Sequence, residues 1–374
     1  MEIIHLVLGK ANPQRMNGVN KVVYEMATRQ ADKGFSVQVW GIAKDTTHNY
    51  PNRNFITKIF KAQRNPFSLH QQLKQAIAAK NVNTVFHLHG GFIPTFYAAS
   101  QWLKKNHIPF ITMTHGAYNT IAMQKSYYLK KLYFHLFEKK LLAAASFIHC
   151  IGNSEVDGLH KVYPNNKTVL IPYGFDMPVT NAIEANNADE FIIGFCGRLD
   201  VFTKGLNELV EGFQLFLQHN SNAQLWLIGD SKEKAALQER VQLAGIENKV
   251  VFYGSKYGDE KLYLLQQCTV FASPSRNEGL PAAVLEAAAL GLPCLVTEAT
   301  NTGLAINQYN AGVVIKATDA IEIAEGLKNL LNTMQHENEK AAMKQNAKKM
   351  IIEYFNWNNT LNELDTVYKK ALAK

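Results

Sequence analysis

The sequence is poor in cysteine and contains no long apolar run. Its four cysteines are Cys150, Cys196, Cys268 and Cys294, and no two of them form a C-x-x-C pair. Widely spaced cysteines in apolar surroundings exclude a disulfide framework and a cysteine-ligated zinc site, and they indicate reduced thiols in a cytoplasmic protein. The most apolar stretch, 141–151, is about half the roughly 20 residues that a membrane-spanning helix needs.

Three further absences narrow the function. The first ten residues lack a basic segment and include Glu2, so we expect no signal peptide and a cytoplasmic location. No Asp-x-Asp motif occurs, so we predict neither a metal-bridged diphosphate nor any metal or other cofactor. No G-x-G-x-x-G follows an apolar run, which disfavours a nicotinamide dehydrogenase.

The composition is that of an ordinary folded protein with excess positive charge. At 374 residues the chain exceeds the usual size of one hydrophobic core, so two domains are expected. A formal net charge of +8 favours anionic partners. Phosphates, acidic membranes and nucleic acid all satisfy that criterion, and charge alone does not choose among them.

Apolar, β-rich runs alternate with amphipathic helical stretches along the chain. The predicted strands are 3–8, 37–40, 85–88, 110–114, 191–196, 224–228, 250–253 and 270–272. The spacing of apolar residues predicts helices over 19–33 and 357–372. This order of elements predicts parallel, doubly wound α/β sheets.

A break in this pattern separates two predicted domains. Residues 177–190 contain Pro178 and three asparagines and lack periodicity, so they are expected to be a linker. The first domain is then 1–176 and the second 191–356, and the helix at about 357–374 is expected to pack back on the first. Both domains should be Rossmann-like and should face a central cleft.

Two carboxylates mark the segment that follows the strand 270–272. Pro281 suits a first helical position and the alanine-rich run after it favours a helix. Backbone N–H groups near Gly279 and Leu280 would then lie at a helix start, where the macrodipole favours a sugar diphosphate. Glu278 and Glu286 would accept hydrogen bonds from ribose and sugar hydroxyls. The alternative is that both are ordinary exposed acids.

Two cations follow the strand that opens the second domain. The run G-R-L-D-V-F-T-K-G places Arg198 and Lys204 beyond the carboxyl end of that strand, where open α/β sheets bind ligands. A guanidinium and an ammonium there match a diphosphate and could neutralise a phosphate leaving group. Taken singly, each could equally be a solvated loop residue.

Together these segments carry a family resemblance. The Glu278/Glu286 pair, the run 197–205 and the L-I-G-D of 227–230 resemble the donor domain of retaining GT-B glycosyltransferases of family 4, the group 1 type. The resemblance covers almost the whole chain. It implies that Arg198 and Lys204 bind the donor diphosphate, that Glu286 takes the ribose hydroxyls and that Glu278 lies by the transferred sugar.

The first half contributes two further candidates. Gly18 lies where the family has a glycine-rich loop facing the donor phosphates, although Asn17-Gly18 stands in place of Gly-Gly and a plain loop glycine is the alternative. His115 ends the strand 110–114 and matches a family histidine near the reacting sugar, so we predict a catalytic role for it beside Glu278. His89, at the end of the preceding strand, is a weaker candidate.

Residues 125–142 mix lysines with aromatic and aliphatic residues at helical spacing. An interfacial helix needs apolar anchors and cations for anionic lipids, so we expect peripheral contact with the inner face of the plasma membrane. A buried helix with a solvated basic edge explains the run nearly as well.

The resemblance implies transfer of a hexosyl or N-acetylhexosaminyl group. The donor would be a nucleoside-diphosphate sugar, with uridine as the expected base, and the acceptor a hydroxyl of a glycan or lipid-linked molecule. The anomeric configuration would be retained, and surface polysaccharide or glycoconjugate synthesis is the expected setting, with no nucleic-acid partner. Alternatives are a nucleotide-sugar epimerase or glycan phosphorylase on the same fold, or a non-catalytic sugar-nucleotide binder.

Overall fold

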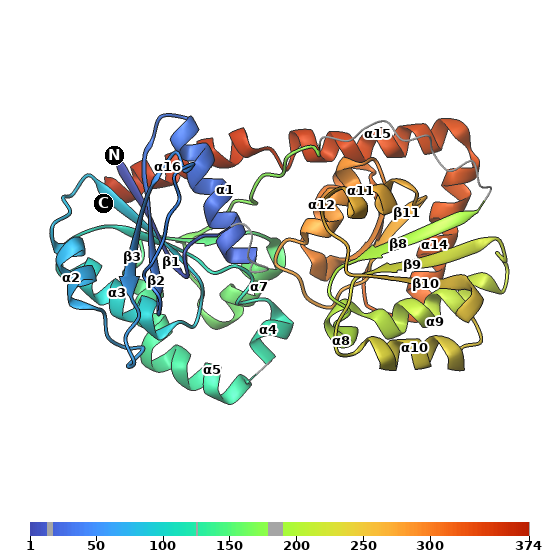
Figure 1. Ribbon diagram of the computed structural model, residues 1–374, viewed down its shortest axis with the longest axis horizontal. Coiled ribbons are helices and arrows are strands. Elements are labelled where there is room, and N and C mark those ends of the chain that lie inside the picture. The colour runs from blue at the N-terminus through green and yellow to red at the C-terminus, as the bar shows by residue number, and fades with distance from the viewer. Residues whose placement is uncertain (13–17, 125, 179–189, 374) are drawn as a thin grey trace. The chain divides into compact units, whose positions relative to one another are not determined.

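The computed structural model describes residues 1–12, 18–124, 126–178 and 190–373. They form two compact α/β units, Met1–Tyr173 with Trp357–Lys374, and Gly174–Asn356 (Figure 1). The division falls after Tyr173, three residues before the expected end of the first domain at 176, and the Phe175 N–H donates to the Phe355 carbonyl at 2.8 Å within the second unit. Residues 179–189 of the predicted linker lie outside the described residues.

The first unit is built on a parallel sheet with the order β3-β2-β1-β4-β5-β6-β7. Its strands are β1 Glu2–Leu8, β2 Ser36–Ala43, β3 Ile56–Lys61, β4 Thr84–His89, β5 Phe110–Met113, β6 Phe147–Cys150 and β7 Thr168–Leu170. Its helices are α1 Gly18–Asp32, α2 Gln71–Ala78, α3 Pro94–Lys105, α4 Thr120–Gln124, α5 Tyr127–Tyr133, α6 Lys139–Ala144, α7 Asn153–Val162 and α16 Trp357–Leu372, with a π-helical turn, η1 Phe134–Glu138, between α5 and α6.

The second unit repeats this plan with the order β10-β9-β8-β11-β12-β13, again parallel. Its strands are β8 Phe191–Cys196, β9 Ala223–Ile228, β10 Val250–Gly254, β11 Val270–Ser273, β12 Cys294–Thr297 and β13 Gly312–Ile315. Its α-helices are α8 Val201–Lys204, α9 Leu206–Leu217, α10 Lys234–Leu243, α11 Gly258–Gln266, α12 Ala282–Ala289, α13 Gly303–Tyr309, α14 Ala320–Gln335 and α15 Glu337–Glu353, with short 3-10 turns η2 Glu247–Lys249 and η3 Glu298–Thr300.

The eight predicted strands are present, each to within a few residues, and the fold is the predicted pair of doubly wound parallel sheets. Five strands, β3, β6, β7, β12 and β13, were not predicted. Most of these are three or four residues long, and β3 is a longer strand at the sheet edge with an uneven burial pattern. Short runs of this kind lack the length that makes a strand recognisable from periodicity.

Glycines allow the first crossover of the second unit to fold back tightly. Gly205 joins α8 to α9 with a left-handed φ of +65°, and a Cβ on it would meet the Pro274 carbonyl oxygen at 2.4 Å. Side-chain-bearing residues disfavour this φ, and the contact leaves no room for a methyl group. The missing side chain of Gly205 therefore brings the α8 loop against the segment that follows β11.

The face of the first sheet that α1 and α16 cover has a polar interior. Four buried histidines lie on it, namely His5 of β1, His87 and His89 of β4 and His149 of β6. Burial lowers the pKa of His5 and of His149 to about 4, and it lowers those of His87 and His89 well below the usual range. This part of the core is therefore filled by uncharged imidazoles.

Gly205→Ala should destabilise the second unit more than Gly245→Ala does. Gly245 has nearly the same φ, +66°, but no atom lies within 4 Å of an added Cβ. Gly245→Ala therefore reports only the left-handed strain, about 1–2 kcal/mol, whereas Gly205→Ala adds the clash and should cost more than about 3 kcal/mol. Denaturant unfolding of both variants measures the difference, and equal costs would contradict the close approach.

The buried histidines should make the protein acid-sensitive. In the unfolded chain each binds a proton near pH 6.5. In the folded state burial lowers the pKa of His5 and His149 to about 4 and that of His115 to about 3, and it lowers the pKa values of His87 and His89 well below the usual range. Stability from these groups is complete above pH 6.5 and is lost as the pH falls.

Two buried acids oppose this trend. Burial raises the pKa of Glu138 to about 7 and raises that of Glu155 as well, so their contribution is complete below pH 4.5 and is lost as the pH rises. Near pH 5 the five histidines outnumber the two acids, so unfolding should take up protons and the free energy of unfolding should fall as the pH falls, by about 1.4 kcal/mol per pH unit for each net proton taken up. Urea unfolding at pH 7, 6 and 5 measures this slope, and a flat profile would contradict it.

Candidate active site

The site in the second unit forms where β8 and β11 lie side by side. These strands pair directly, Val270 with Ile193 and Phe271 with Gly194, although two strands and their helices separate them in sequence. This is the point at which the strand order reverses, and ligands bind outside the carboxyl ends of the strands at such a point. The two segments singled out from the sequence follow these two strands.

The loop after β8 carries the predicted cations. Asp200 caps the short helix α8 through a hydrogen bond from the Thr203 N–H at 3.0 Å. Lys204 ends α8 with its side chain 21% exposed, whereas the Arg198 side chain is 75% exposed and lies 3.4 Å from the Asp200 carboxylate. Lys204 is therefore held in place, while most of the Arg198 guanidinium faces solvent.

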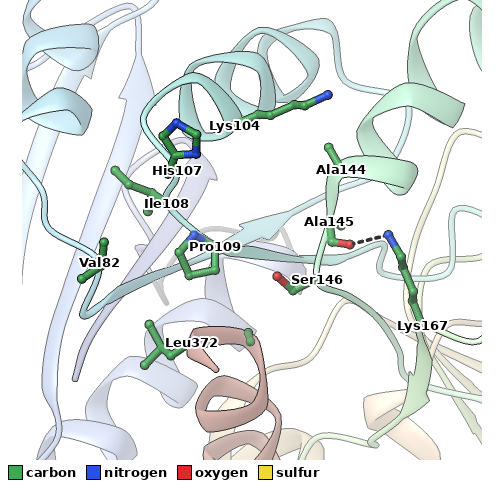
Figure 2. A pocket seen from close by; sticks show the side chains of 11 residues that line it. Val82, Lys104, His107, Ile108, Pro109, Ala144, Ala145, Ser146, Lys167 and Leu372 are labelled. Carbon is green, nitrogen blue, oxygen red and sulfur yellow. Dashed lines mark hydrogen bonds between the residues drawn. The ribbon is translucent and has the colours of Figure 1, made fainter. Parts of the chain in front are cut away.

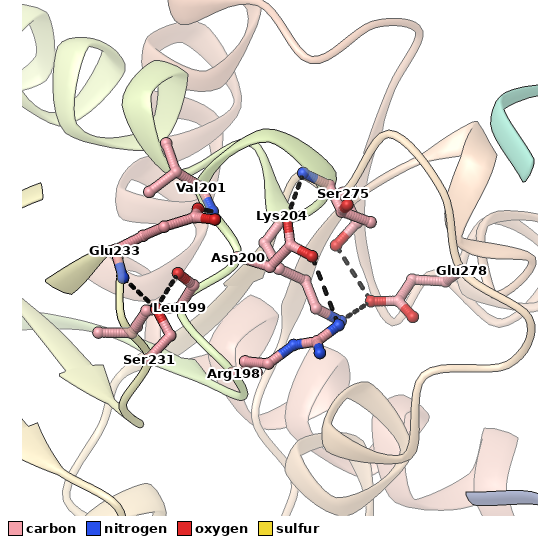
Figure 3. A network of polar contacts seen from close by, with 10 residues as sticks. Arg198, Leu199, Asp200, Val201, Lys204, Ser231, Glu233, Ser275 and Glu278 are labelled. Atoms are coloured by element: carbon pink, nitrogen blue, oxygen red, sulfur yellow. Dashed lines mark hydrogen bonds and ion pairs between the residues drawn. The ribbon is translucent and has the colours of Figure 1, made fainter. Parts of the chain in front are cut away.

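Lys204 and Glu278 form an ion pair that joins the two segments. Figure 3 shows their side chains pointing toward one another, with the Ser275 hydroxyl 3.3 Å from the same carboxylate oxygen. The Glu278 side chain is 16% exposed. The structure thus brings Arg198, Lys204 and Glu278 to one edge of the sheet.

The backbone of the segment after β11 is tethered by side chains from elsewhere in this unit. The Asn301 side-chain amide donates to the carbonyls of Glu278 and Gly279 at 2.8 and 2.7 Å. The Thr297 hydroxyl donates to the Ser275 carbonyl at 2.5 Å. Sequence reasoning did not assign Asn301 a role, since a side chain that holds a distant loop carries no local signal.

Helix α12 begins one residue later than the sequence predicts. Pro281 is its N-cap rather than its first helical residue, and among the described residues no side chain caps this end. Leu280 is buried, and Gly279 is half-buried just before it. A helix start without a side-chain cap keeps its macrodipole available to an anion.

Glu286 lies one turn inside α12 and is paired with a lysine that sequence reasoning missed. The Lys261 ammonium, from α11, lies 2.7 Å from the Glu286 carboxylate, and the two side chains are 19% and 14% exposed. Lys261 lies in an ordinary amphipathic stretch, so nothing in its sequence context marks it. The site therefore holds two lysine–glutamate pairs rather than one.

Cys196, at the end of β8, lies near both pairs. Burial raises the pKa of its thiol to about 11; Lys261 and Lys204 oppose the rise and Glu286 adds to it. The four cysteines are unpaired, as predicted, and three of them are buried. A thiol with this pKa is protonated at neutral pH and is a poor nucleophile.

His115 lies in the first unit, immediately beyond β5. Its φ is +52°, and Gly116 follows at +80°. The buried Glu155 carboxylate of α7 holds this turn by accepting hydrogen bonds from the Thr114 hydroxyl and the Gly116 N–H, both at 2.5 Å. A strained, half-exposed histidine braced by a buried acid fits a functional position.

His115 is also hydrogen-bonded to the buried histidines. Its Nε2 lies 3.1 Å from His89 Nδ1, and His89 Nε2 lies 2.9 Å from His5 Nδ1. Sequence reasoning named His89 as a weak candidate and did not consider His5 or His149. The nitrogens of His5, His87 and His89 lie within 4.8 Å of one another, close enough to bind a metal ion.

Gly18, the remaining candidate, is the first residue of α1 and is exposed, with nothing in the described chain within 4 Å of an added Cβ. Most of the loop that precedes it, residues 13–17, lies outside the described residues.

A pocket of about 500 Å³ in the first unit lies away from these residues (Figure 2). Its lining includes Val82, Pro109 and Ser146, which precede β4, β5 and β6, so it lies at the amino ends of the strands. His115 follows a carboxyl end. The pocket is therefore at the opposite edge of the sheet and is not part of the candidate site.

Two family models match the chain. Glycosyltransferase Family 4 matches residues 16–177, and Glycosyl transferases group 1 matches residues 177–350. Among similar proteins, the capsular polysaccharide biosynthesis glycosyltransferase CapM of Staphylococcus aureus is 26% identical over 50% of this chain, and the match spans 48% of CapM. The N-acetyl-alpha-D-glucosaminyl L-malate synthase of Bacillus anthracis is 22% identical over 96% of this chain and 95% of its own.

Solved structures show the same fold. A glycosyltransferase from Rickettsia africae superposes with a TM-score of 0.75 at 16% identity over 99% of both chains. Sucrose-phosphate synthase from Thermosynechococcus elongatus superposes with a TM-score of 0.73 at 17% identity over 100% of both chains. Because the two family models together match residues 16–350, the chain belongs to the group 1 glycosyltransferases, and its likeness to these solved structures shows that it has the GT-B fold.

Proposed function

We propose that the protein transfers a sugar from a nucleoside-diphosphate sugar to a hydroxyl acceptor, with retention of the anomeric configuration. The observation that supports this most directly is the pair of lysine–glutamate contacts, Lys204–Glu278 and Lys261–Glu286, at the reversal point of the second sheet. Cations there suit a diphosphate, and carboxylates suit the hydroxyls at either end of an elongated donor.

Each pair would exchange partners when the donor binds. Phosphate oxygens would take the Lys204 ammonium and the exposed Arg198 guanidinium, while sugar hydroxyls would donate to the freed Glu278 carboxylate. Glu286 would accept the ribose hydroxyls, and the start of α12 with the backbone of Gly279 and Leu280 would face the diphosphate. In this proposal the substrate takes the place of each partner in the two ion pairs.

The chemical step would depend on stabilising the leaving phosphate. Negative charge develops on the diphosphate as the glycosidic bond breaks, and Arg198, Lys204 and the helix dipole would neutralise it without a metal ion. We propose front-face attack assisted by that phosphate, with His115 contacting the sugar or the acceptor and Gly18 approaching the phosphates. Double displacement would instead need a nucleophilic carboxylate at the anomeric carbon.

The donor and acceptor classes are proposed from relatives. HepE of Anabaena, which is similar in fold, has been solved in complex with UDP and glucose. The relative from Xanthomonas oryzae is a GDP-mannose:cellobiosyl-diphosphopolyprenol alpha-mannosyltransferase. We propose a UDP-hexose or UDP-N-acetylhexosamine donor and a glycan or lipid-linked acceptor, in the synthesis of a surface polysaccharide or glycoconjugate.

We also propose that residues 126–142 contact a membrane at its cytoplasmic face. In the described chain no helix has the length and apolarity to cross a bilayer. The segment is amphipathic, since Phe134 and Leu141 are buried while five large apolar side chains are exposed: Tyr127 at 48%, Tyr128 at 83%, Leu129 at 72%, Leu132 at 58% and Leu136 at 46%. Exposed Lys131, Lys139 and Lys140 on the same segment would attract anionic lipid headgroups.

Donor titrations with variants of the two glutamates test the proposed reaction. Glu286→Gln should raise the donor KM by about 10- to 100-fold, because it weakens a carboxylate contact made in the ground state. Glu278→Gln should lower kcat by about 100-fold with little change in KM. Turnover of a panel of nucleotide sugars, followed by mass spectrometry and NMR of the product anomer, measures both effects, and EDTA should leave the rate unchanged.

Glu339→Gln, an exposed acid on α15, is the matched control and should behave like the unmodified protein. An isomerised donor without acceptor would indicate an epimerase, dependence on free phosphate a phosphorylase, and donor binding without turnover a non-catalytic binder. Unchanged turnover in Glu278→Gln would contradict the role given to that residue.

Vesicle co-sedimentation tests the membrane contact. The unmodified protein should bind vesicles containing anionic phospholipid and leave neutral vesicles in the supernatant. Leu129→Ser with Leu132→Ser should reduce binding about tenfold or more, because the anchors are lost. Leu243→Ser, which removes an 81% exposed leucine from α10, is the control and should bind normally. Equal binding by all three proteins would refute this surface.

A further inference from the structure

We propose that the five histidines of the first unit, with Gln30 and Tyr368, form one directional hydrogen-bond chain that sets the tautomer of His115. The chain ends at His115, whose Nδ1 is left without a proton and is presented as a hydrogen-bond acceptor. The ligand assigned to this nitrogen rests on the proposed glycosyl transfer, whereas the chain itself does not.

The direction of the chain is set by a backbone carbonyl that can only accept. His149 Nε2 lies 2.7 Å from the Ile171 carbonyl oxygen, so it carries the proton. In a neutral imidazole the other nitrogen, His149 Nδ1, is then bare. It lies 3.4 Å from His87 Nε2, which must therefore donate.

The hydrogen-bond chain continues from β4 to α16 and α1, the two helices on this face. His87 Nδ1 is bare and lies 2.9 Å from the Tyr368 hydroxyl of α16, which donates to it. The Tyr368 oxygen then accepts from the Gln30 side-chain NH2 at 3.2 Å. This contact fixes the orientation of the Gln30 amide and turns its carbonyl oxygen toward His5.

The last three links lead to the candidate site. The Gln30 oxygen accepts from His5 Nε2 at 2.6 Å, which leaves His5 Nδ1 bare. His89 Nε2 donates to that nitrogen at 2.9 Å, and His89 Nδ1 in turn accepts from His115 Nε2 at 3.1 Å. One tautomer for each ring satisfies every contact, and reversing any link would oppose two donors or two acceptors.

The environment supports neutral rings throughout. All four inner histidines are buried, and burial lowers their pKa values and that of His115. A metal ion on His5, His87 and His89 would need nitrogens that this chain already uses. The geometry therefore favours the hydrogen-bond chain over a metal site.

The direction of the hydrogen-bond chain matters at His115, its half-buried end. Within the described residues the contact with His89 is the one hydrogen bond made by the His115 ring, and Glu155 holds the turn that carries it. An unprotonated Nδ1 accepts a hydrogen bond from a hydroxyl and cannot donate one to a carbonyl or phosphate. His115 would thus select a hydroxyl of the donor sugar or of the acceptor, and Tyr368 acts as a positioning residue.

Long-range 1H–15N correlation of the full chain labelled with 15N-histidine tests the assignment. All five rings should be neutral with the proton on Nε2. In Tyr368→Phe the Gln30 amide loses the contact that orients it, so His115 should become a mixture of tautomers and kcat should fall about tenfold. Deoxygenated donors and acceptors then show which substrate loses rate in the unmodified protein but not in the variant.

Tyr118→Phe is the control, because Tyr118 is also a buried tyrosine of this unit. Its hydroxyl donates to the Glu138 carboxylate at 3.1 Å and is not part of the hydrogen-bond chain. The variant should leave the His115 tautomer unchanged. A His115 proton on Nδ1, a charged ring, a stoichiometric bound metal on the inner histidines, or an unchanged tautomer and kcat in Tyr368→Phe would each overturn the proposal. The spectra require no activity, so they hold even if the proposed reaction fails.

Discussion

The pairing of β8 with β11 is the contact on which the second unit's site depends. Two parallel strands that neighbour each other at a reversal of strand order leave their carboxyl ends open to the same crevice. The loop to Lys204 leaves one strand and the segment to Glu278 leaves the other. Without this pairing the two charged side chains would belong to separate edges of the sheet, and neither loop would have a partner.

Close packing then fixes the two loops against each other. Gly205 leaves room for the Pro274 carbonyl, and the Arg276 N–H donates to the Thr203 carbonyl at 2.9 Å. The Asn301 side chain donates to the carbonyls of Glu278 and Gly279. Carboxylates and ammonium groups that are only 14–21% exposed need partners, since an unpaired charge in such a place is costly. The two ion pairs meet that need.

The core of the first unit also contains buried polar groups, but these are neutral. The sheet face that α1 and α16 cover carries imidazoles instead of aliphatic side chains, and each buried nitrogen requires a hydrogen-bond partner. The partners come from β1, β4, β6, α1, α16 and the Ile171 carbonyl, which are spread from one end of the sequence to the other. The C-terminal helix is therefore part of the interior that leads to His115, in addition to burying Leu361, Leu364 and Val367.

Local sequence was sufficient for the repeating βαβ elements and for the two donor-site segments. The strand 191–196 is a continuous apolar run and the helix 357–372 is long and periodic, so each can be recognised without its neighbours. Among the strands of three or four residues, β5 and β11 were predicted whereas β6, β7, β12 and β13 were not, because a run this short shows no reliable period. The start of α12 was predicted one residue too early, at Pro281, since the start of a helix depends on backbone geometry as well as on residue type.

Tertiary structure alone decided which distant side chains meet. Lys261 has no distinguishing sequence context and becomes part of the site only because α11 packs beside Glu286. His5, Gln30, His89 and Tyr368 are spread from one end of the chain to the other, and their proton positions follow from contacts that no local pattern encodes. The sequence by itself determined the elements and the residue types at their ends, because those depend on neighbours along the chain. The partners of those residues depended on strand order and helix packing, which are properties of the folded whole.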